Sequence, residues 1–245
     1  MTNRPAKPSL QTRLHRDGFA FVPARSLRAE MSEESLGDWS AFAASWNDLT
    51  PDTYLAAASG RQRRRRHGIF SASEGQGIRR MPQRPHFQTL ANNPLQGDIQ
   101  RWFAPIRPSI ADGASLRHIL DFARKVFEGV APGRRDWQIE VHQFRIEARA
   151  GEAGEPTPEG VHRDGVDYVL VLMVERENIE SGTTTIHALD GALLGSFTLT
   201  QPLDTALVVD TRVCHGVTPV TALDPARPAH RDVLVATFKA VTPDN

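Results

Sequence analysis

The chain has 245 residues, enough for one large domain with a sizeable core. Lys plus Arg number 29 and Asp plus Glu also number 29, which excludes attraction to nucleic acid or an anionic membrane through overall charge. The longest apolar run, Val169 to Val174, is far shorter than the roughly 20 residues of a membrane-spanning helix. The first twenty residues show no apolar signal region, and a single cysteine excludes an intrachain disulfide. These features predict a cytoplasmic protein.

The first 132 residues predict helices and irregular segments. Leu10 to Phe21 predicts a short helix that runs into a strand through an Asp-Gly turn. From Glu33 to Asp48, apolar residues at three- and four-residue spacing predict a second helix. The Arg-, Gly- and Pro-rich segment from Arg61 to Gln88 predicts an irregular hairpin or an ordered loop. From Asp112 to Val130, an apolar stripe predicts a third helix with Asp112 as its N-cap.

After Gly133 the pattern becomes extended and stays so. The predicted strands, separated by Gly, Pro, Asp and Asn turns, are Trp137 to Ala148, Asp167 to Glu175, Thr183 to Leu189, Ser196 to Thr200, Thr205 to Asp210 and Arg231 to Ala240. Many short strands with hardly any helix among them indicate a β-sandwich or barrel. We therefore predict one domain over 1–245, mainly β with packing helices (α+β), in which residues 1–132 support a β core at 133–240.

Two histidines and an aspartate are candidates for a metal site. His162 and Asp164 precede an apolar strand, and residues two apart in an extended segment project to the same side. His215 follows another strand, 51 residues after Asp164. Two histidines and one carboxylate form the facial triad of non-haem Fe(II) oxygenases, although zinc hydrolysis on such a triad is chemically possible. A bare His-x-Asp is also common in solvated turns.

Arg231 strengthens the oxygenase interpretation. It opens the last predicted strand, 16 residues after His215, where its guanidinium could bind a carboxylate bidentately. The ordered set of His-x-Asp before a strand, a distant His and this Arg favours a 2-oxoglutarate-dependent Fe(II) oxygenase over unrelated surface residues. The competing ligand candidates, each without a partner at suitable spacing, are Asp190, Asp204 and His187.

Three stretches carry a family resemblance: VHRDGVDYV from Val161, DTRVCHGVTPV from Asp210 and RDVLVATF from Arg231. They resemble the bacterial 2OG-Fe dioxygenase family that includes the L-isoleucine 4-hydroxylases. The segments RRRRHGIF from Arg63 and Gln88 to Pro105 look like upstream parts of that family, so the resemblance covers roughly residues 50 to 240. It implies a double-stranded β-helix, a cupin-like jelly roll with helices against the larger sheet. The resemblance leads us to expect a Gly-Gly-Glu-like turn after the Asn178 segment, but this chain has Ser-Gly-Thr at 181–183. Its substrate preference can therefore differ from that of the isoleucine enzymes.

The resemblance also implies the chemistry. Fe(II) would sit on His162, Asp164 and His215, with 2-oxoglutarate and O2 as cosubstrates and ascorbate as a supporting reductant. Oxidative decarboxylation to succinate and CO2 would drive hydroxylation of a C–H bond. Arg231 would bind the distal carboxylate of 2-oxoglutarate, helped by the hydroxyl of Thr218 or Thr237.

The substrate side is less defined. The strand from Trp137 places Gln143 and Arg145 on one face and His142, Phe144 and Ile146 on the other, and either face could line the barrel. A free L-amino acid, aliphatic or polar, or a close derivative needs a partner for its carboxylate. Candidates are Arg145 with Gln143 beside it, or Arg101, and each arginine could instead form a structural ion pair. The alternatives are a larger peptide-tethered or natural-product substrate, and a non-enzymatic metal-binding jelly roll.

Two further features have plain structural interpretations. The Arg63 to Arg66 run predicts a solvated strand face, or else a lid over the active site, because a neutral chain lacks the basic asymmetry of a nucleic-acid binder. Cys214 predicts a small buried hydrophobe, since it points away from its neighbour His215. The tryptophans expected to pack in the core or between elements are Trp39, Trp46, Trp102 and Trp137.

Overall fold

A computed structural model describes residues 8–32, 34–59, 61–133 and 136–241. The helices are α1 (Leu10–Asp17), α2 (Ala24–Glu30), α3 (Trp39–Ala44), α4 (Thr53–Ser59), α5 (Pro108–Ala111) and α6 (Ala114–Val130), with 3₁₀ turns at Glu34–Leu36 and Ser45–Asp48. The strands are β1 (Phe19–Val22), β2 (Thr50–Pro51), β3 (Arg64–Ser73), β4 (Gly77–Arg80), β5 (Trp137–Ala148), β6 (Tyr168–Glu177), β7 (Ile179–Ser181), β8 (Thr183–Ala188), β9 (Leu193–Thr198), β10 (Thr205–Val209), β11 (Val213–Val217), β12 (Val220–Ala222) and β13 (Ala229–Ala240).

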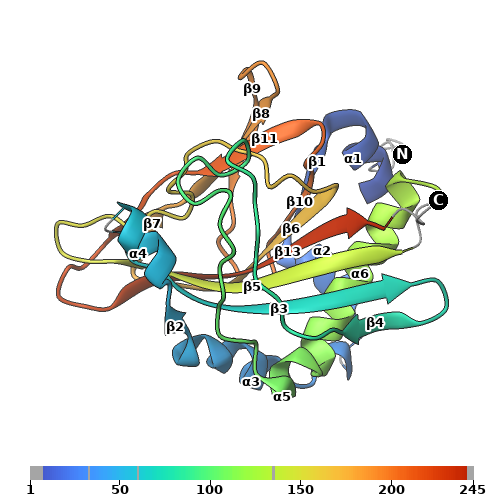
Figure 1. Cartoon of the computed structure of the whole chain (residues 1–245), viewed down its shortest axis with the longest axis horizontal. Helices are drawn as coiled ribbons and strands as arrows, with labels where there is room; N and C mark the ends of the chain where they lie inside the picture. The colour runs from blue at the N-terminus through green and yellow to red at the C-terminus, as the bar shows by residue number, and fades with distance from the viewer. Residues whose placement is uncertain (1–7, 33, 60, 134–135, 242–245) are drawn as a thin grey trace, which may run out of the picture.

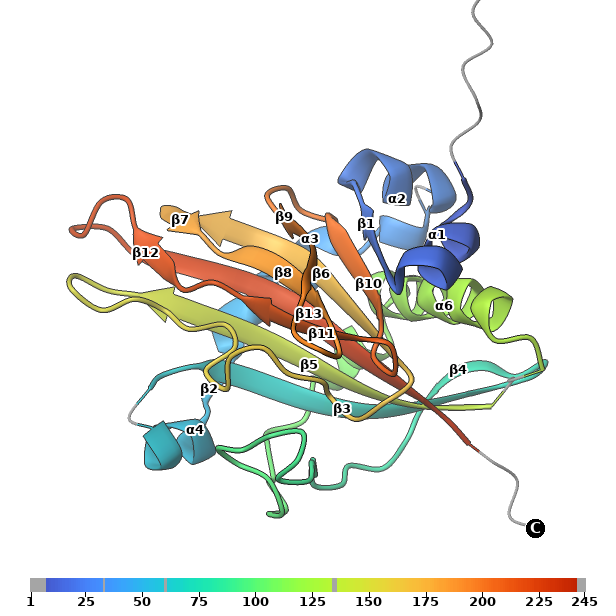
Figure 2. The same ribbon diagram turned by 90° about the horizontal axis from the view of Figure 1, so that it is seen from above.

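The strands form a jelly roll, as predicted. One large sheet has the order β1-β10-β6-β13-β5-β3-β2, with β4 beside β3. The opposing strands form two small sheets, β11-β8-β9 and β12-β7. One face of the large sheet is covered by helices α1, α2, α3 and α6, and its other face is turned toward the two small sheets (Figures 1 and 2).

Alternation along the central strands separates a helix-packed face from an inner face. On β13, Leu234, Ala236 and Phe238 are fully buried in the core cluster that also contains the apolar stripe of α6. Arg231 and Thr237 belong to the other face of β13, which lines a cavity. Because side chains of a strand alternate, one β-strand both anchors the helical layer and supplies residues to the interior.

The helix predicted from Asp112 is confirmed as α6, except at its start. Its N-cap position is Gly113, with no cap bond from that residue. The capping role comes from Asp38, whose carboxylate accepts hydrogen bonds from the backbone N–H of Ser115 at 2.8 Å and from its hydroxyl. Asp112 instead forms ion pairs, with Arg80 at 3.2 Å and with Arg117. A carboxylate distant in sequence thus replaces the local cap.

Other N-terminal predictions need correction. The helix expected at 33–48 is divided into two 3₁₀ turns and the short α3, and the interruption falls at Gly37 and Asp38; Glu33 lies outside the described residues. The segment from Arg61 contains a regular hairpin, β3–β4, rather than an irregular one. Because β1 to β4 join the large sheet, residues 1–132 do more than support a core that begins at 133.

The tryptophan predictions hold in part. Trp46 and Trp137 are buried and Trp39 packs against the core, but Trp102 is 57% exposed, so it does not pack in the core. Cys214 is half-buried rather than buried. Within the described ranges, the structure has no helix with the length and apolarity needed to cross a membrane.

Candidate active site

His162, Asp164 and His215 converge, although they are distant in sequence. The Nε2 atom of His162 lies 3.8 Å from Oδ1 of Asp164, and Nε2 of His215 lies 3.5 Å from Oδ2. One ligand atom from each residue lies within 4.8 Å of the others, near enough to surround one ion. The two histidines face each other as an antiparallel bridge with reciprocal backbone hydrogen bonds of 2.9 Å. Backbone pairing therefore sets the spacing of two of the three side chains.

The loop that carries Asp164 is held by a second carboxylate. Asp210, buried after β10, accepts hydrogen bonds from the backbone N–H groups of Asp164 (2.9 Å), Gly165 (2.8 Å) and Val166 (3.1 Å). Gly165 has φ +79, and a Cβ there would lie 2.1 Å from Nδ2 of Asn92. The positive φ therefore favours glycine at this turn, and any side chain there would displace the amide of Asn92.

The electrostatics suit a divalent cation. Burial raises the pKa of Asp164, and burial together with the neighbouring His162 lowers the pKa of His215 to about 4, which keeps that imidazole neutral. Burial alone would lower the pKa of His162, but Asp164 and Glu159 raise it. Nδ1 of His162 donates to the carbonyl of Gly160 at 3.0 Å, which leaves Nε2 as a ligand atom. This imidazole and carboxylate donor set fits Fe(II).

A cavity of about 450 Å³ adjoins the triad, a size typical of small-molecule sites. Arg231 lines it, two residues inside β13 rather than at its start. Arg231 is 2% exposed, and its Nε and Nη2 atoms have no hydrogen-bond partner in the described ranges. Burial, and the charge of neighbouring Arg176, lower the pKa of Arg231 to about 10. Two unpaired donors on a buried cation fit the distal carboxylate of 2-oxoglutarate.

The two hydroxyl helpers expected beside Arg231 are placed elsewhere. Thr237 lines the cavity, but it lies six residues along β13, about 20 Å from Arg231 at the usual rise of a strand. One carboxylate cannot contact both residues. The hydroxyl of Thr218 accepts a hydrogen bond from the backbone of Thr183 at 2.9 Å, and Thr218 does not line the cavity described here.

The competing metal ligands have structural roles in turns. Asp204 accepts hydrogen bonds from the backbone N–H groups of Ala24, Thr200 and Gln201. Asp190 accepts from the backbone of Ala192, and Nδ1 of His187 bonds with the carbonyl of Gly191. None of the three belongs to a metal-competent group of the described residues.

The face of β5 that lines the cavity is the opposite of the one that carries Gln143 and Arg145. Gln143 donates to the hydroxyl of Ser45 at 2.7 Å, and Arg145 forms two hydrogen bonds with Asp232, at 2.8 and 2.6 Å. Neither side chain lines the cavity, so this placement argues against their expected roles in substrate binding. Alternation alone did not decide which face of β5 lines the cavity. The ion pair between Arg145 and buried Asp232 holds the Arg145 face away from it.

Arg101 does line the cavity and is 1% exposed. Its guanidinium donates to two amides, Gln96 at 2.6 Å and Gln88 at 2.9 Å, and its Nε has no partner. Among the described residues no carboxylate pairs with it, so the alternative of a structural ion pair is not realised. Gln88 in turn donates to Asp164 at 3.4 Å.

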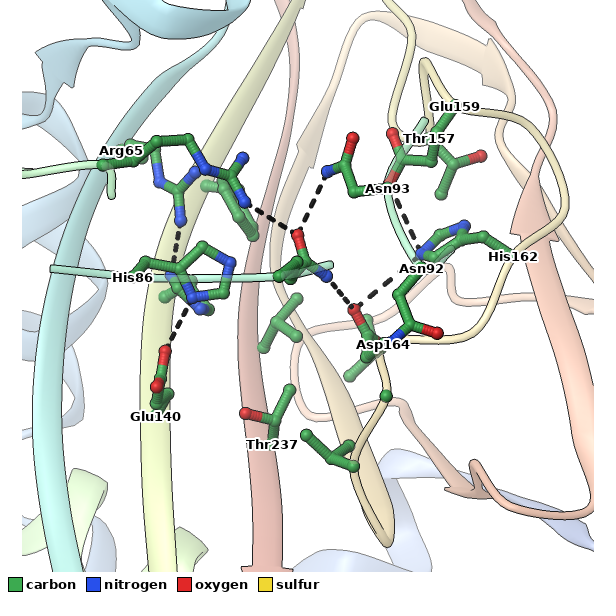
Figure 3. A pocket seen from close by; sticks show the side chains of 18 of the residues that line it. Arg65, His86, Asn92, Asn93, Glu140, Thr157, Glu159, His162, Asp164 and Thr237 are labelled. Carbon is green, nitrogen blue, oxygen red and sulfur yellow. Dashed lines mark hydrogen bonds and ion pairs between the residues drawn. The ribbon is translucent and has the colours of Figure 1, made fainter. Parts of the chain in front are cut away.

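A second polar group was missed by the sequence interpretation. On the inner face of β5, His142 meets Arg65 from β3. Glu140 meets His86, from the long segment after β4 (Figure 3). Arg65 is buried, and its guanidinium lies 3.6 Å from the ring centre of Phe103. The prediction of a solvated strand face therefore holds only for the arginines of the run that point outward. The sequence signal for this group was the alternation of an extended segment, in which residues two apart share a side. Arg63 and Arg65 both line the cavity, whereas Arg64 between them is exposed.

Comparisons with known proteins agree with this geometry. The model of the 2OG-Fe dioxygenase family matches residues 43–237. The chain is 27% identical over 238 residues to 3(1)-hydroxy-L-isoleucine 4-dioxygenase of Pantoea ananatis, covering 93% of this chain and 94% of that protein. A crystal structure of a bsmA homologue from Methylobium petroleophilum has 34% identity and a TM-score of 0.84, covering 96% of this chain and 94% of the other. IDO from Bacillus thuringiensis, at 18% identity, has a TM-score of 0.77, covers 99% of this chain and 100% of its own, and supports the fold alone.

Proposed function

The chain belongs to the 2OG-Fe dioxygenase family, and from this membership we propose that it hydroxylates a free L-amino acid or a close derivative. The family uses Fe(II), 2-oxoglutarate and O2, and its members act as dioxygenases. The non-enzymatic alternative is therefore set aside. A relative named for a hydroxylated isoleucine supports an amino-acid substrate.

One observation carries the proposal: the triad adjoins a small cavity that also contains two buried arginines, Arg231 and Arg101, for which the described residues supply no carboxylate partner. A buried unpaired cation is costly, so each arginine is suited to an anionic ligand. We assign the distal carboxylate of 2-oxoglutarate to Arg231 and the carboxylate of the substrate to Arg101. The cosubstrate and substrate then each have one anchor.

The roles of the residues follow from this assignment. His162, Asp164 and His215 would hold Fe(II), which with 2-oxoglutarate and O2 supplies the oxidising power. Asp210 keeps Asp164 in place through the backbone of its loop. Arg101 orients the substrate, and valines of the inner faces, such as Val171 and Val235, supply an apolar part of the wall that helps to exclude water.

The test is incubation with Fe(II), ascorbate, 2-oxoglutarate and a panel of L-amino acids. We expect succinate release that depends on one amino acid, with a product heavier by one oxygen atom. Arg101→Gln should raise the KM for that amino acid, while the control Arg149→Gln, an exposed arginine outside the cavity, should not. Succinate release that no amino acid stimulates would refute this substrate class.

A larger, tethered substrate is the second candidate. Phe87 lines the cavity yet is 51% exposed, and Leu90 nearby in sequence is 53% exposed, so apolar side chains extend to the outside. Such a surface suits a carrier or peptide attached to the reacting residue. Turnover of a peptide-linked amino acid in preference to the free one would favour this candidate.

A further inference from the structure

Two imidazoles stand side by side on the cavity wall, away from the metal triad. His86 and His142 both line the cavity, and their ring centres lie 4.8 Å apart with an interplanar angle of 77°. Figure 3 shows His86 between Arg65 and Glu140. In the described part of the chain, neither Nε2 atom has a hydrogen-bond partner. Both nitrogens are thus available to a ligand.

The hydrogen-bond network fixes the tautomer of His142. Its Nδ1 lies 2.6 Å from Nη2 of Arg65, and a guanidinium can only donate. Nδ1 therefore accepts, and the proton of the neutral ring is on Nε2. Burial, and then the charge of Arg65, lower the pKa of His142 well below its ordinary value, so the ring stays neutral. His142 presents an N–H donor to the cavity.

His86 has the opposite tautomer. Its Nδ1 lies 2.6 Å from a carboxylate oxygen of Glu140, and an ionised carboxylate can only accept. Burial disfavours ionisation of Glu140, but hydrogen bonds from His67 and His86 lower the pKa of the carboxyl overall. Burial lowers the pKa of His86 to about 4, so this ring is neutral as well. Its Nε2 presents a lone pair to the cavity.

A metal ion is the competing occupant, because His67, His86, Glu140 and His142 each offer a ligand atom within 4.8 Å of the others. Three contacts oppose it. The guanidinium of Arg65 occupies Nδ1 of His142 and would repel a cation. One oxygen of Glu140 already accepts N–H groups from His67 at 3.2 Å and from His86.

We propose that His86 and His142 bind one neutral group of the substrate that both donates and accepts, a hydroxyl or a primary carboxamide. His142 donates to the oxygen of that group, and His86 accepts its O–H or N–H. A carboxylate would face the lone pair of His86, and an ammonium would face the N–H of His142 beside Arg65. This inference rests on the proposed function, and it narrows the substrate to an amino acid or derivative with such a group in addition to its carboxylate.

The experiment measures binding without turnover. The enzyme, loaded with Fe(II) and 2-oxoglutarate in the absence of O2, is titrated with two matched pairs, threonine against valine and asparagine against aspartate. The polar neutral member of at least one pair should bind about tenfold or more tightly than its partner. His142→Ala should abolish that preference, whereas His118→Ala, on the exposed face of α6, should keep it.

A second measurement does not depend on any substrate or variant. The ¹⁵N chemical shifts of the imidazoles should report a proton on Nδ1 of His86 and on Nε2 of His142. The reverse tautomers, or a second equivalent of Fe(II) or Zn(II) that binds wild type but not His86→Ala, would overturn the inference. Equal affinity for the two members of each pair would overturn this subsite and leave the proposed function standing. If no amino acid binds at all, the proposed substrate class fails, and the inference fails with it.

Discussion

Replacing Arg231 with Met should stabilise the metal-free protein while it weakens cosubstrate binding. Arg231 is 2% exposed, and two of its guanidinium nitrogens have no hydrogen-bond partner among the residues that the structure describes. Burial, and then Arg176, lower its pKa from 12.5 to about 10. At about 1.4 kcal/mol per unit of pKa, the charged side chain destabilises the fold by about 3 kcal/mol at neutral pH, because the unfolded chain holds the same proton without this penalty. Met has a similar length and no charge, so it should recover up to about 3 kcal/mol.

The same change removes the proposed anchor of the 2-oxoglutarate carboxylate. Loss of one partner of a buried charge pair costs about 2 to 5 kcal/mol, so affinity should fall roughly thirtyfold to several thousandfold. Urea denaturation measures the first effect, and anaerobic titration of the Fe(II) protein with 2-oxoglutarate measures the second.

Arg145→Met is the matched control. Its carboxylate partner Asp232 is 0% exposed, so the variant should lose about 3 to 5 kcal/mol of stability and keep its 2-oxoglutarate affinity. An Arg231→Met protein that is less stable than wild type and binds 2-oxoglutarate normally would refute the reasoning.

Three further predictions concern the site. Alanine at His162, Asp164 or His215 should abolish both the hydroxylated product and stoichiometric Fe(II) binding, measured by mass spectrometry and metal analysis; a variant with full activity would remove the metal from the mechanism. Asp210→Asn should weaken Fe(II) binding about tenfold to a hundredfold without removing a ligand, because an amide oxygen cannot replace a carboxylate that accepts three N–H groups; unchanged affinity in a metal titration would contradict this. Stability should fall as pH drops from 6.5 to 4, because unfolded His86 takes up a proton that the folded residue, with a pKa of about 4, does not; this accounts for about 3 kcal/mol. Denaturation of His86→Phe across that range should show a smaller loss, and an identical pH profile would argue against the assigned neutral ring.

The sequence predicts the strands best where alternation is long. The strand from Trp137 to Ala148 matches β5 at both ends, since apolar residues recur at every second position, from Trp137 to Val141 on one face and from Phe144 to Ala148 on the other. The helix at 33–48 fails because apolar spacing alone does not register the break at Gly37 and Asp38. The carboxylate of Asp38 caps α6, about 80 residues later in the chain, and no local sequence pattern contains such a tertiary contact.

The convergence of His162, Asp164 and His215 was predictable from the sequence because each of these proposed ligands lies next to a recognisable strand. The wall of the cavity was not. Gln143 and Arg145 look like binding residues, yet the burial of Asp232 on the outer face draws Arg145 away from the cavity. His86 reaches the site from a segment without regular structure, where spacing carries no information on direction. Polar residues on an inner face are therefore predictable only once their partners are known.

The backbone bridge between His162 and His215 bears on how this scaffold can be engineered. Because the two residues oppose each other on one rung, their separation is independent of the length of the chain that connects them. Insertions or grafted loops at the exposed turn of Asp190 to Ala192 should therefore be tolerated. A deletion beside either histidine would turn the following side chains to the wrong side of the strand. Libraries designed to change selectivity should diversify the cavity wall and leave 160–166 and 210–217 intact.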